Sequence, residues 1–330
     1  MCGPLSPGAA TCDTTAMPAD RPILGIALML VFCLFAPLAD GLAKMLGDSV
    51  PLLQVVAVRF LAQAVLLLPL LRVLGGRLRV PAGHGGVVVA RTVLHVAGIA
   101  LMFLSLRYLP LADAIAIAYV MPFLVLLAGG VALGEEVGWR RTSACLAGFA
   151  GTLMVLQPAF REVGAAALLP LGVAVAFSAF MLLTRRVARV MPPVELQAVN
   201  GLIGTALLLP PLVLAQGTGL PELDPVRPDA RGLWLLAGIG VLGTAAHLAL
   251  TASLRFAPAA TVAPMQYLEI PFAVLLGLLL FGDLPGPLAF AGIAVVMGAG
   301  LYVILRERRL AASAARPAAP PPQPPGPPAA

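Results

Sequence analysis

Apolar stretches follow one another along almost the whole chain, and each is long enough to cross a lipid bilayer. The hydrocarbon core of a bilayer takes about 20 apolar residues per helix. Of the 330 residues, 60% are hydrophobic and 11% are charged, which leaves little room for a water-soluble domain. The sequence therefore predicts an all-α integral membrane protein with several transmembrane helices.

Ten such spans are expected, separated by Pro, Gly or charge clusters. Their ranges are 22–46, 52–73, 87–106, 110–133, 142–158, 165–184, 194–215, 232–254, 258–281 and 286–305. If the N-terminus is cytoplasmic, the inner connections together with both ends of the chain hold 14 basic residues, and the outer connections hold 5. Basic residues accumulate on the cytoplasmic side, so we expect both termini there, in a cell inner or plasma membrane. The same bias explains the net charge of +6 without a nucleic-acid partner.

The two ends of the chain differ from its apolar middle. Residues 1–21 form a polar leader, in which Met17 offers a second start, and we expect no function there. Residues 306–330 carry arginines and then mostly Ala and Pro. Such a composition cannot bury a core, so a disordered cytoplasmic tail is expected. The four cysteines have neither disulfide-framework nor zinc spacing, and no metal or cofactor is expected.

An internal repeat links the two halves of the chain. Residues 105–112 align with residues 253–260 at a separation of 148 residues, and the same offset places Tyr119 on Tyr267. Each half would contain five helices, an odd number, so the second half must enter the membrane in the opposite orientation. Inverted repeats are typical of secondary transporters, which bind their substrate near the midplane where the halves meet.

Several short motifs occur in an order and a doubling that are typical of one family. They are Asp40-Gly41-Leu42-Ala43-Lys44, the run over 100–114, Gly134-Glu135-Glu136, Glu269-Ile270-Pro271 and Phe281-Gly282-Asp283. Over about residues 22–306 the chain resembles the EamA-type proteins of the drug/metabolite transporter (DMT) superfamily.

The resemblance implies ten transmembrane helices in two inverted five-helix EamA repeats, here 22–158 and 165–305. Helices one to four and six to nine would surround a central pocket, with helices five and ten at the periphery. Members of the family carry amino acids, nucleosides, vitamins such as riboflavin, S-adenosylmethionine or drug-like compounds.

Glu269 lies near the middle of an apolar span, where a charged side chain costs about 2.5–3.5 kcal/mol unless it faces a partner or a wet cavity. Pro264 and Pro271 flank it and interrupt the backbone hydrogen bonds of the helix. A broken, polar half-helix at the midplane is where such a transporter binds its cargo, and Gln266 belongs to the same segment. The alternative is an ordinary kinked helix in which Glu269 pairs with a neighbour.

Arg59 and Asp40 are expected at similar depths in the first two spans, with Gln63 one helical turn from Arg59. One interpretation is a structural ion pair that holds the two spans together. The other is an anchor for an anion or a carboxylate at the outer mouth of the pocket. The sequence leaves both open.

His95 and His247 are the histidines inside spans, and the repeat offset places His247 one turn from His95, so both should point inward. Histidine titrates near physiological pH, which makes protons a candidate coupling ion, together with Glu269. The alternative is a neutral histidine bonded to nearby backbone or polar side chains.

Four further residues carry expectations of their own. Tyr119 and Tyr267 occupy matching places in the repeats and could line the pocket, although apolar packing explains either one alone. Asn200 lies where the repeat places the counterpart of Arg59 and could donate hydrogen bonds to cargo. Asp113 is expected to cap its helix at the membrane surface.

The strings typical of intramembrane proteases and of phosphate-binding loops do not occur, so no enzyme is expected. We interpret the chain as a secondary transporter of a small organic metabolite that works by alternating access, coupled to protons or by exchange, with export favoured. The alternative is an importer of a vitamin or nucleoside-like compound of the riboflavin or S-adenosylmethionine class. A structural membrane protein that transports nothing is the remote alternative. Expected partners are the small-molecule substrate, membrane lipid and protons, and a homodimer stays open.

Overall fold

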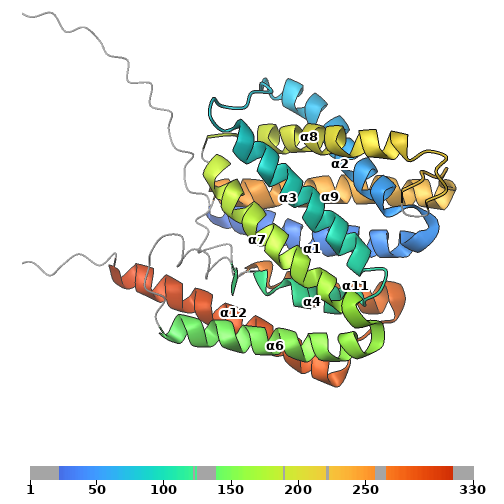
Figure 1. The fold of residues 1–330 in the computed structure, drawn as a ribbon. Coiled ribbons are helices and arrows are strands. Elements are labelled where there is room, and N and C mark those ends of the chain that lie inside the picture. Colours follow the sequence, from blue (N-terminus) through green and yellow to red (C-terminus); the bar gives the residue numbers. More distant parts are fainter. Residues whose placement is uncertain are drawn as a thin grey trace, which may run out of the picture.

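The computed structural model describes residues 22–121, 123–124, 139–188, 190–220, 223–256 and 265–314. Within these ranges all regular secondary structure is helical (Figure 1). The helices are α1 (Pro22–Leu46), α2 (Leu52–Val73), α3 (Gly85–Ser105), α4 (Leu111–Ala118), α6 (Trp139–Val163), α7 (Leu169–Val187), α8 (Pro193–Leu214), α9 (Ala230–Phe256), α11 (Glu269–Phe281) and α12 (Pro287–Ala314), with the short 3-10 helices η1 (Gly47–Ser49) and η2 (Gly164–Leu168). The predicted leader, most of the tail, the Gly134-Glu135-Glu136 motif and Pro264 lie outside the described residues.

Six apolar stretches of the described chain are long enough to cross a membrane, and two shorter apolar helices, Glu269–Phe281 and Pro287–Tyr302, accompany them. One of the six, Leu146–Thr184, contains most of α6, all of η2 and most of α7. The predicted all-helical membrane architecture is therefore confirmed, while the count of crossings and the side of the termini stay predictions.

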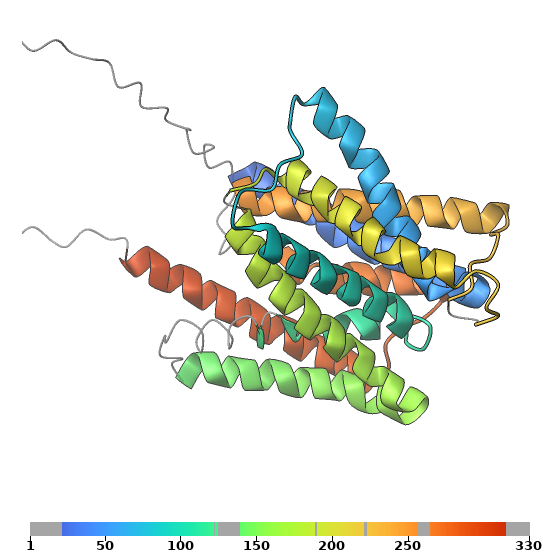
Figure 2. The same ribbon diagram turned by 45° about the horizontal axis from the view of Figure 1, so that its top comes forward.

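Helix pairing follows the sequence repeat. α1 packs along α9 and α3 along α7, while α2 contacts α8, α4 contacts α11 and α6 contacts α12. Each of these pairs joins one helix from the first predicted half to one from the second, and both views show α6 and α12 side by side at one edge (Figures 1 and 2). The two halves therefore interlock around a shared centre.

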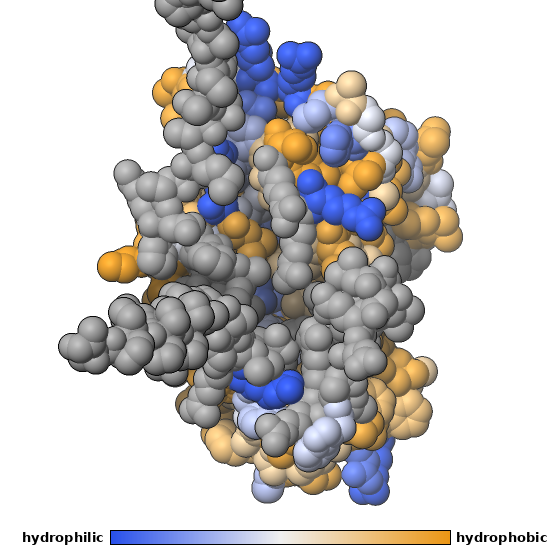
Figure 3. Space-filling view, turned by 90° about the vertical axis from the view of Figure 1, so that its left-hand side faces the viewer, coloured by the Kyte–Doolittle hydropathy of each residue, from blue (hydrophilic) through white to orange (hydrophobic). Residues whose placement is uncertain are grey.

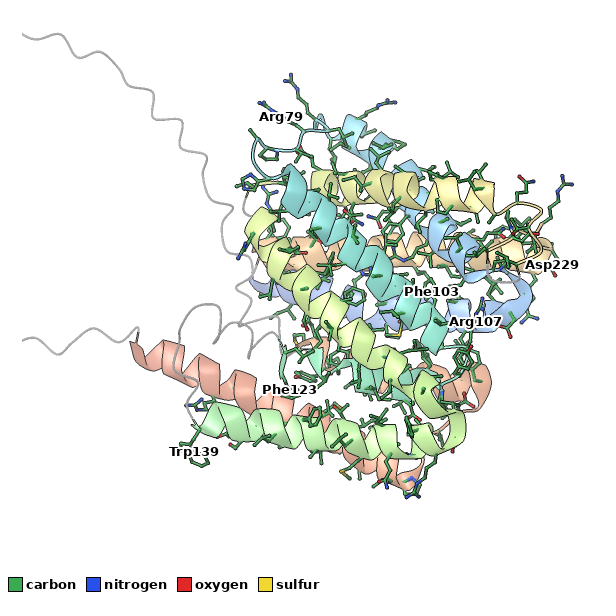
Figure 4. All side chains as sticks on the ribbon, viewed as in Figure 1. Arg79, Phe103, Arg107, Phe123, Trp139 and Asp229 are labelled. Carbon is green, nitrogen blue, oxygen red and sulfur yellow. The ribbon has the colours of Figure 1, made fainter. Side chains whose placement is uncertain are left out.

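The bundle has two ends that differ in which helices begin there. We call the end where α1, α3 and α6 begin, and where α7 and α9 end, the proximal end; it lies on the left in Figure 1. Hydrophilic side chains are spread over this end among hydrophobic ones (Figure 3), and Arg186 and Arg255, near the ends of α7 and α9, are exposed. The opposite, distal end carries Arg107 and Asp229, while Arg79 and Trp139 lie toward the proximal end (Figure 4).

The α4 helix is buried on every side, as expected of a helix that is apolar all round. The residue before its first turn is Pro110, and no side chain caps that turn. Asp113 lies within the first turn with its side chain buried, and its Oδ1 atom has no hydrogen-bond partner. The expectation that Asp113 caps the helix at the membrane surface is therefore wrong, because the surrounding helices enclose the start of α4.

Candidate functional site

A cavity lies among α1, α2, α3, α4, α7, α9 and α11. Polar and aromatic side chains share its wall with apolar ones: Asp40, Arg59, His247, Gln266 and Glu269 on the polar side, and Phe32, Phe103, Tyr119 and Phe177 among the aromatic rings. The α6, α8 and α12 helices contribute no lining residue. Both predicted halves thus build the cavity, and α6 and α12, the fifth and tenth of the predicted spans, stay outside it.

The space open to the centres of water molecules in this cavity is about 80 Å³. One water needs about 10–15 Å³ of such space, so several waters fit. A metabolite with fused rings is much larger than this. Its binding therefore requires the lining side chains and helices to move apart.

Glu269 forms the start of α11, directly after the helix is interrupted at Tyr267 and Leu268. The hydroxyl oxygen of Tyr119 lies 2.6 Å from Glu269 Oε2 and 2.6 Å from the carbonyl oxygen of Gln266. A hydroxyl carries one proton, so Tyr119 donates to one of these two acceptors at a time. Glu269 lines the cavity, as expected of a residue that binds cargo. It also has a neighbouring donor, as expected of a glutamate that pairs within a kinked helix.

Arg59 is buried in α2, and its guanidinium faces α9. Its Nη2 atom lies 3.0 Å from His247 Nδ1 and 3.4 Å from the carbonyl oxygen of Gly243, and Nη1 lies 3.5 Å from Gln63 Oε1. The ion pairs among the described residues join Lys44 to Asp283 and Arg107 to Asp48. The structural ion pair between Arg59 and Asp40 is therefore not formed, and both side chains instead line the same cavity.

His95 and His247, which the repeat predicts to point inward, lie against each other with ring centroids 4.4 Å apart. His247 Nδ1 lies 3.0 Å from Arg59 Nη2, which can only donate, and 3.1 Å from the carbonyl oxygen of Gly243, which can only accept. Nδ1 therefore accepts from Arg59 when the ring proton is on Nε2 and donates to Gly243 when the proton is on Nδ1. His247 lines the cavity, whereas His95 lies behind the wall with no exposed surface. The two histidines thus connect the cavity to a polar layer behind it.

Gln63 and Asn200 belong to that layer and do not line the cavity. The amide of Gln63 donates to the backbone oxygen of Gln197 at 2.7 Å and to Gln197 Oε1 at 3.0 Å. Asn200 lies between the side chains of Arg91 and His95. Both amides therefore join helices to one another, and the proposed donation from Asn200 to cargo would need this layer to open.

Tyr267 also lies behind the cavity wall. Its ring centroid is 5.5 Å from that of Tyr119, and the ring fills the space beside Gly300 of α12, where an added Cβ would overlap it. Of the two symmetry-related tyrosines, Tyr119 lines the cavity and Tyr267 does not. Packing against α12 accounts for Tyr267.

The sequence analysis missed Arg91, which is fully buried in α3. Its Nε donates to Thr184 Oγ1 at 2.8 Å, its Nη1 donates to Asn200 Oδ1 at 3.0 Å, and its Cζ lies 4.5 Å from the centre of the Phe180 ring. The signal that singled out Arg59, a charge inside an apolar span, applies equally to Arg91.

These features define a class of protein: a multi-pass helical membrane protein with a polar and aromatic cavity at the centre of its bundle. Residues 23–157 and 164–306 match the EamA-like transporter family. The chain belongs to this family and is a membrane transporter.

Several relatives have names that state which compound they transport. The chain is 33% identical over 223 residues to the riboflavin transporter of Rhizobium johnstonii, covering 66% of this chain and 70% of that protein. It is 28% identical over 281 residues to the riboflavin transporter of Vibrio cholerae, covering 84% and 91%. It is 21% identical over 285 residues to the S-adenosylmethionine uptake transporter of Rickettsia prowazekii, covering 86% and 94%. A solved crystal structure with 22% identity and a TM-score of 0.61 covers 88% of this chain and 99% of its own, and has the same fold.

Proposed function

We propose that this chain imports riboflavin, or a vitamin with a similar fused-ring system, across the cell inner or plasma membrane. The observation that carries the proposal is the cavity itself, in which aromatic rings and hydrogen-bonding groups from both halves face one small space. The similarity to two riboflavin transporters adds a named substrate class. Alternating access is reversible and gradients set its direction, so import here takes the place of the export expected from sequence.

The chemistry of a flavin suits this cavity. Its planar, uncharged ring system can stack on aromatic side chains, and Phe103, Tyr119 and Phe177 contribute such rings to the wall. Its polar edge and its hydroxylated chain need a few well-placed donors and acceptors, as is usual in small-molecule sites. Arg59 supplies donors and Glu269 supplies acceptors.

We further propose that the chain crosses the membrane ten times as two inverted five-helix repeats, 22–158 and 165–305, with both termini in the cytoplasm. The pairing of α1 with α9 and of α3 with α7 supports this, because a two-fold relation between the halves exchanges these two pairs. Rocking of one repeat against the other would expose the cavity first at one end of the bundle and then at the other.

Glu269 is the proposed carrier of a coupling proton. It faces the cavity, and the Tyr119 hydroxyl, 2.6 Å away, can donate to its charged form. Replacement by glutamine keeps the shape and removes the titration. Uptake by wild type should then depend on an imposed proton gradient, whereas any uptake left in Glu269→Gln should not. Equal gradient dependence in the two proteins would contradict this role.

A second candidate substrate is S-adenosylmethionine. Asp40 and Glu269 place two carboxyl groups in the cavity against one guanidinium, which suits a cationic sulfonium group, and the Rickettsia relative is named for this cargo. Competition separates the two candidates, because the true substrate displaces the other at lower concentration.

The test is uptake of radiolabelled riboflavin by proteoliposomes that contain the purified protein. We expect saturable uptake that unlabelled riboflavin blocks, and strong loss of uptake in Glu269→Gln. Glu162→Gln is the matched control, because Glu162 is exposed on α6, which contributes no residue to the cavity. Absence of uptake by folded wild-type protein, with and without a proton gradient, would overturn the proposal for riboflavin.

A further inference from the structure

A buried positive charge without a counter-charge lies behind the cavity. Arg91 has no exposed surface, and the partners of its guanidinium are a threonine hydroxyl, an amide oxygen and the face of an aromatic ring. All of these partners are neutral, no ion pair to Arg91 occurs in the part of the chain that the structure describes, and its Nη2 atom has no hydrogen-bond partner. An arginine stays charged in proteins, and burying a charge without compensation is costly.

A second free donor lies one helical turn along α3. Arg91 must donate to Asn200, so the amide oxygen of Asn200 faces Arg91 and the amide nitrogen faces His95. That nitrogen donates to His95 Nδ1 at 2.9 Å, which places the proton of a neutral His95 on Nε2. His95 Nε2 is buried and has no hydrogen-bond partner. The orientation of one amide thus leaves an N–H group of His95 unsatisfied.

The two side chains that carry these free donors belong to one small region. Arg91 and His95 both contact Asn200, and both lie against the Phe180 ring, at 4.5 Å from Cζ and at 4.7 Å between centroids. His95 also contacts His247, which lines the cavity. Arg91 is in the second turn of α3, and its partner Thr184 is in the last turn of α7, so the region lies between the cavity and the proximal end.

We propose that Arg91 and His95 form a binding site for a compact oxyanion, a phosphate or a carboxylate group, which enters when the proximal half of the bundle opens. The guanidinium and the imidazole would donate charge-assisted and neutral hydrogen bonds to it. The anion is either a free ion or a group carried by the substrate. The second source rests on the proposed flavin transport, whereas the anion site itself does not.

Inorganic phosphate is the first probe, because a ligand that binds only the folded protein raises its thermal stability. The unfolding temperature of detergent-purified protein is measured against phosphate at constant ionic strength, with chloride, which is not an oxyanion, as the replaced anion. We expect a saturable rise in wild type and in Arg72→Gln, whose side chain is exposed at the end of α2, and no rise in Arg91→Gln. Absence of a saturable rise in wild type, or an equal rise in Arg91→Gln, would overturn the site.

Asn200→Asp keeps the test decisive if Arg91→Gln does not fold. This change places a carboxylate of nearly the same shape against Arg91 Nη1 and His95 Nδ1, beside the two free donors, where it would compensate the charge of Arg91. We expect a higher unfolding temperature without phosphate and a loss of the phosphate response. An unchanged phosphate response in a folded Asn200→Asp protein would contradict the proposal.

Two further measurements distinguish a free anion from an anionic group carried by the substrate. Protein-dependent flux of labelled phosphate into proteoliposomes assigns the site to a free ion. Stabilisation by riboflavin 5′-phosphate at lower concentration than by phosphate or by riboflavin assigns it to a group on the cargo. The phosphate titration needs no flavin, so failure of flavin uptake and failure of the anion site are distinguishable.

Discussion

Helices are held together by different kinds of residues at the centre of the bundle and at its edge. At the edge, α6 and α12 approach so closely that a Cβ on Gly151 would lie 2.9 Å from the carbonyl oxygen of Gly292. At the centre, α2, α3, α8 and α9 are joined by buried Arg59, Arg91, Gln63 and Asn200. Small residues are enough to hold helices together in an apolar surrounding, and buried charges are costly there. The comparison shows that the edge is held by close backbone packing and the centre by buried polar contacts, and a ligand at the centre is what the proposed function adds.

The largest expected effect comes from Glu269→Ala at the centre. It removes a cavity-lining carboxyl group and leaves the Tyr119 hydroxyl without one acceptor. Loss of a key contact in a buried site costs about 2 kcal/mol or more, so riboflavin uptake at low concentration should fall about 30-fold or more. The unfolding temperature should stay near that of wild type, and Glu162→Gln should match wild type in both measurements. A large fall in the unfolding temperature would show that Glu269 stabilises the fold, and would contradict the difference drawn between centre and edge.

The next largest effect is expected at the edge, from Gly151→Leu. The new side chain meets the backbone of Gly292 and the side chain of Val295, so overpacking should destabilise the fold by about 1–3 kcal/mol. Less folded protein should be recovered and its unfolding temperature should fall, while the riboflavin affinity of the folded fraction should be unchanged. Gly298→Leu on α12 is the control, because among the described residues no side chain or backbone atom of another part of the fold lies within 4 Å of a Cβ there. A changed affinity in Gly151→Leu would show that edge and centre are coupled.

An effect of similar size, on uptake rather than on stability, is expected from Tyr119→Phe, which removes one hydroxyl from the cavity wall and keeps the ring. A hydrogen bond to a charged group contributes about 1.5–3 kcal/mol, so uptake should fall about 10-fold or more. Tyr302→Phe, an exposed position on α12, should have no effect. Equal uptake by Tyr119→Phe and wild type would remove the hydroxyl from the transport mechanism.

The smallest effect is expected from Asp283→Asn at the distal end. Asp283 pairs with Lys44 at 3.3 Å, and 40% of its side chain is exposed. Exposed ion pairs contribute about 0–1 kcal/mol, so both unfolding temperature and uptake should change little. A 10-fold change in uptake with an unchanged unfolding temperature would show that this ion pair acts in transport and not in the stability of the fold.

Hydropathy and charge placement predicted much of this molecule from its sequence. Apolar length set the helices, and α1 and α2 have the expected bounds. The cost of a buried charge pointed to Arg59 and Glu269, which both line the cavity. The repeat offset predicted that His95 and His247 both point inward, and the structure adds that their rings lie against each other.

The direction in which side chains face was harder to predict. A helix that is apolar all round has no distinct polar face, so its sequence does not say which residues meet the cavity. Tyr267 and Asn200 face other helices for this reason, and Asp113 is enclosed where a surface cap was expected. Arg91 is a charge inside an apolar span, as Arg59 is. What sets it apart, its neutral partners on other helices, is visible only in the structure.

Equilibrium binding of riboflavin tests the central claim most directly. Flavin fluorescence is titrated with purified wild-type protein, Glu269→Gln and Glu162→Gln, each checked for folding by its unfolding temperature. The account predicts saturable quenching by wild type and Glu162→Gln, and affinity at least about 10-fold weaker, or about 1.4 kcal/mol, in Glu269→Gln. Absence of saturable quenching by folded wild-type protein, or equal affinity in all three proteins, would contradict a flavin site at the polar centre of the bundle.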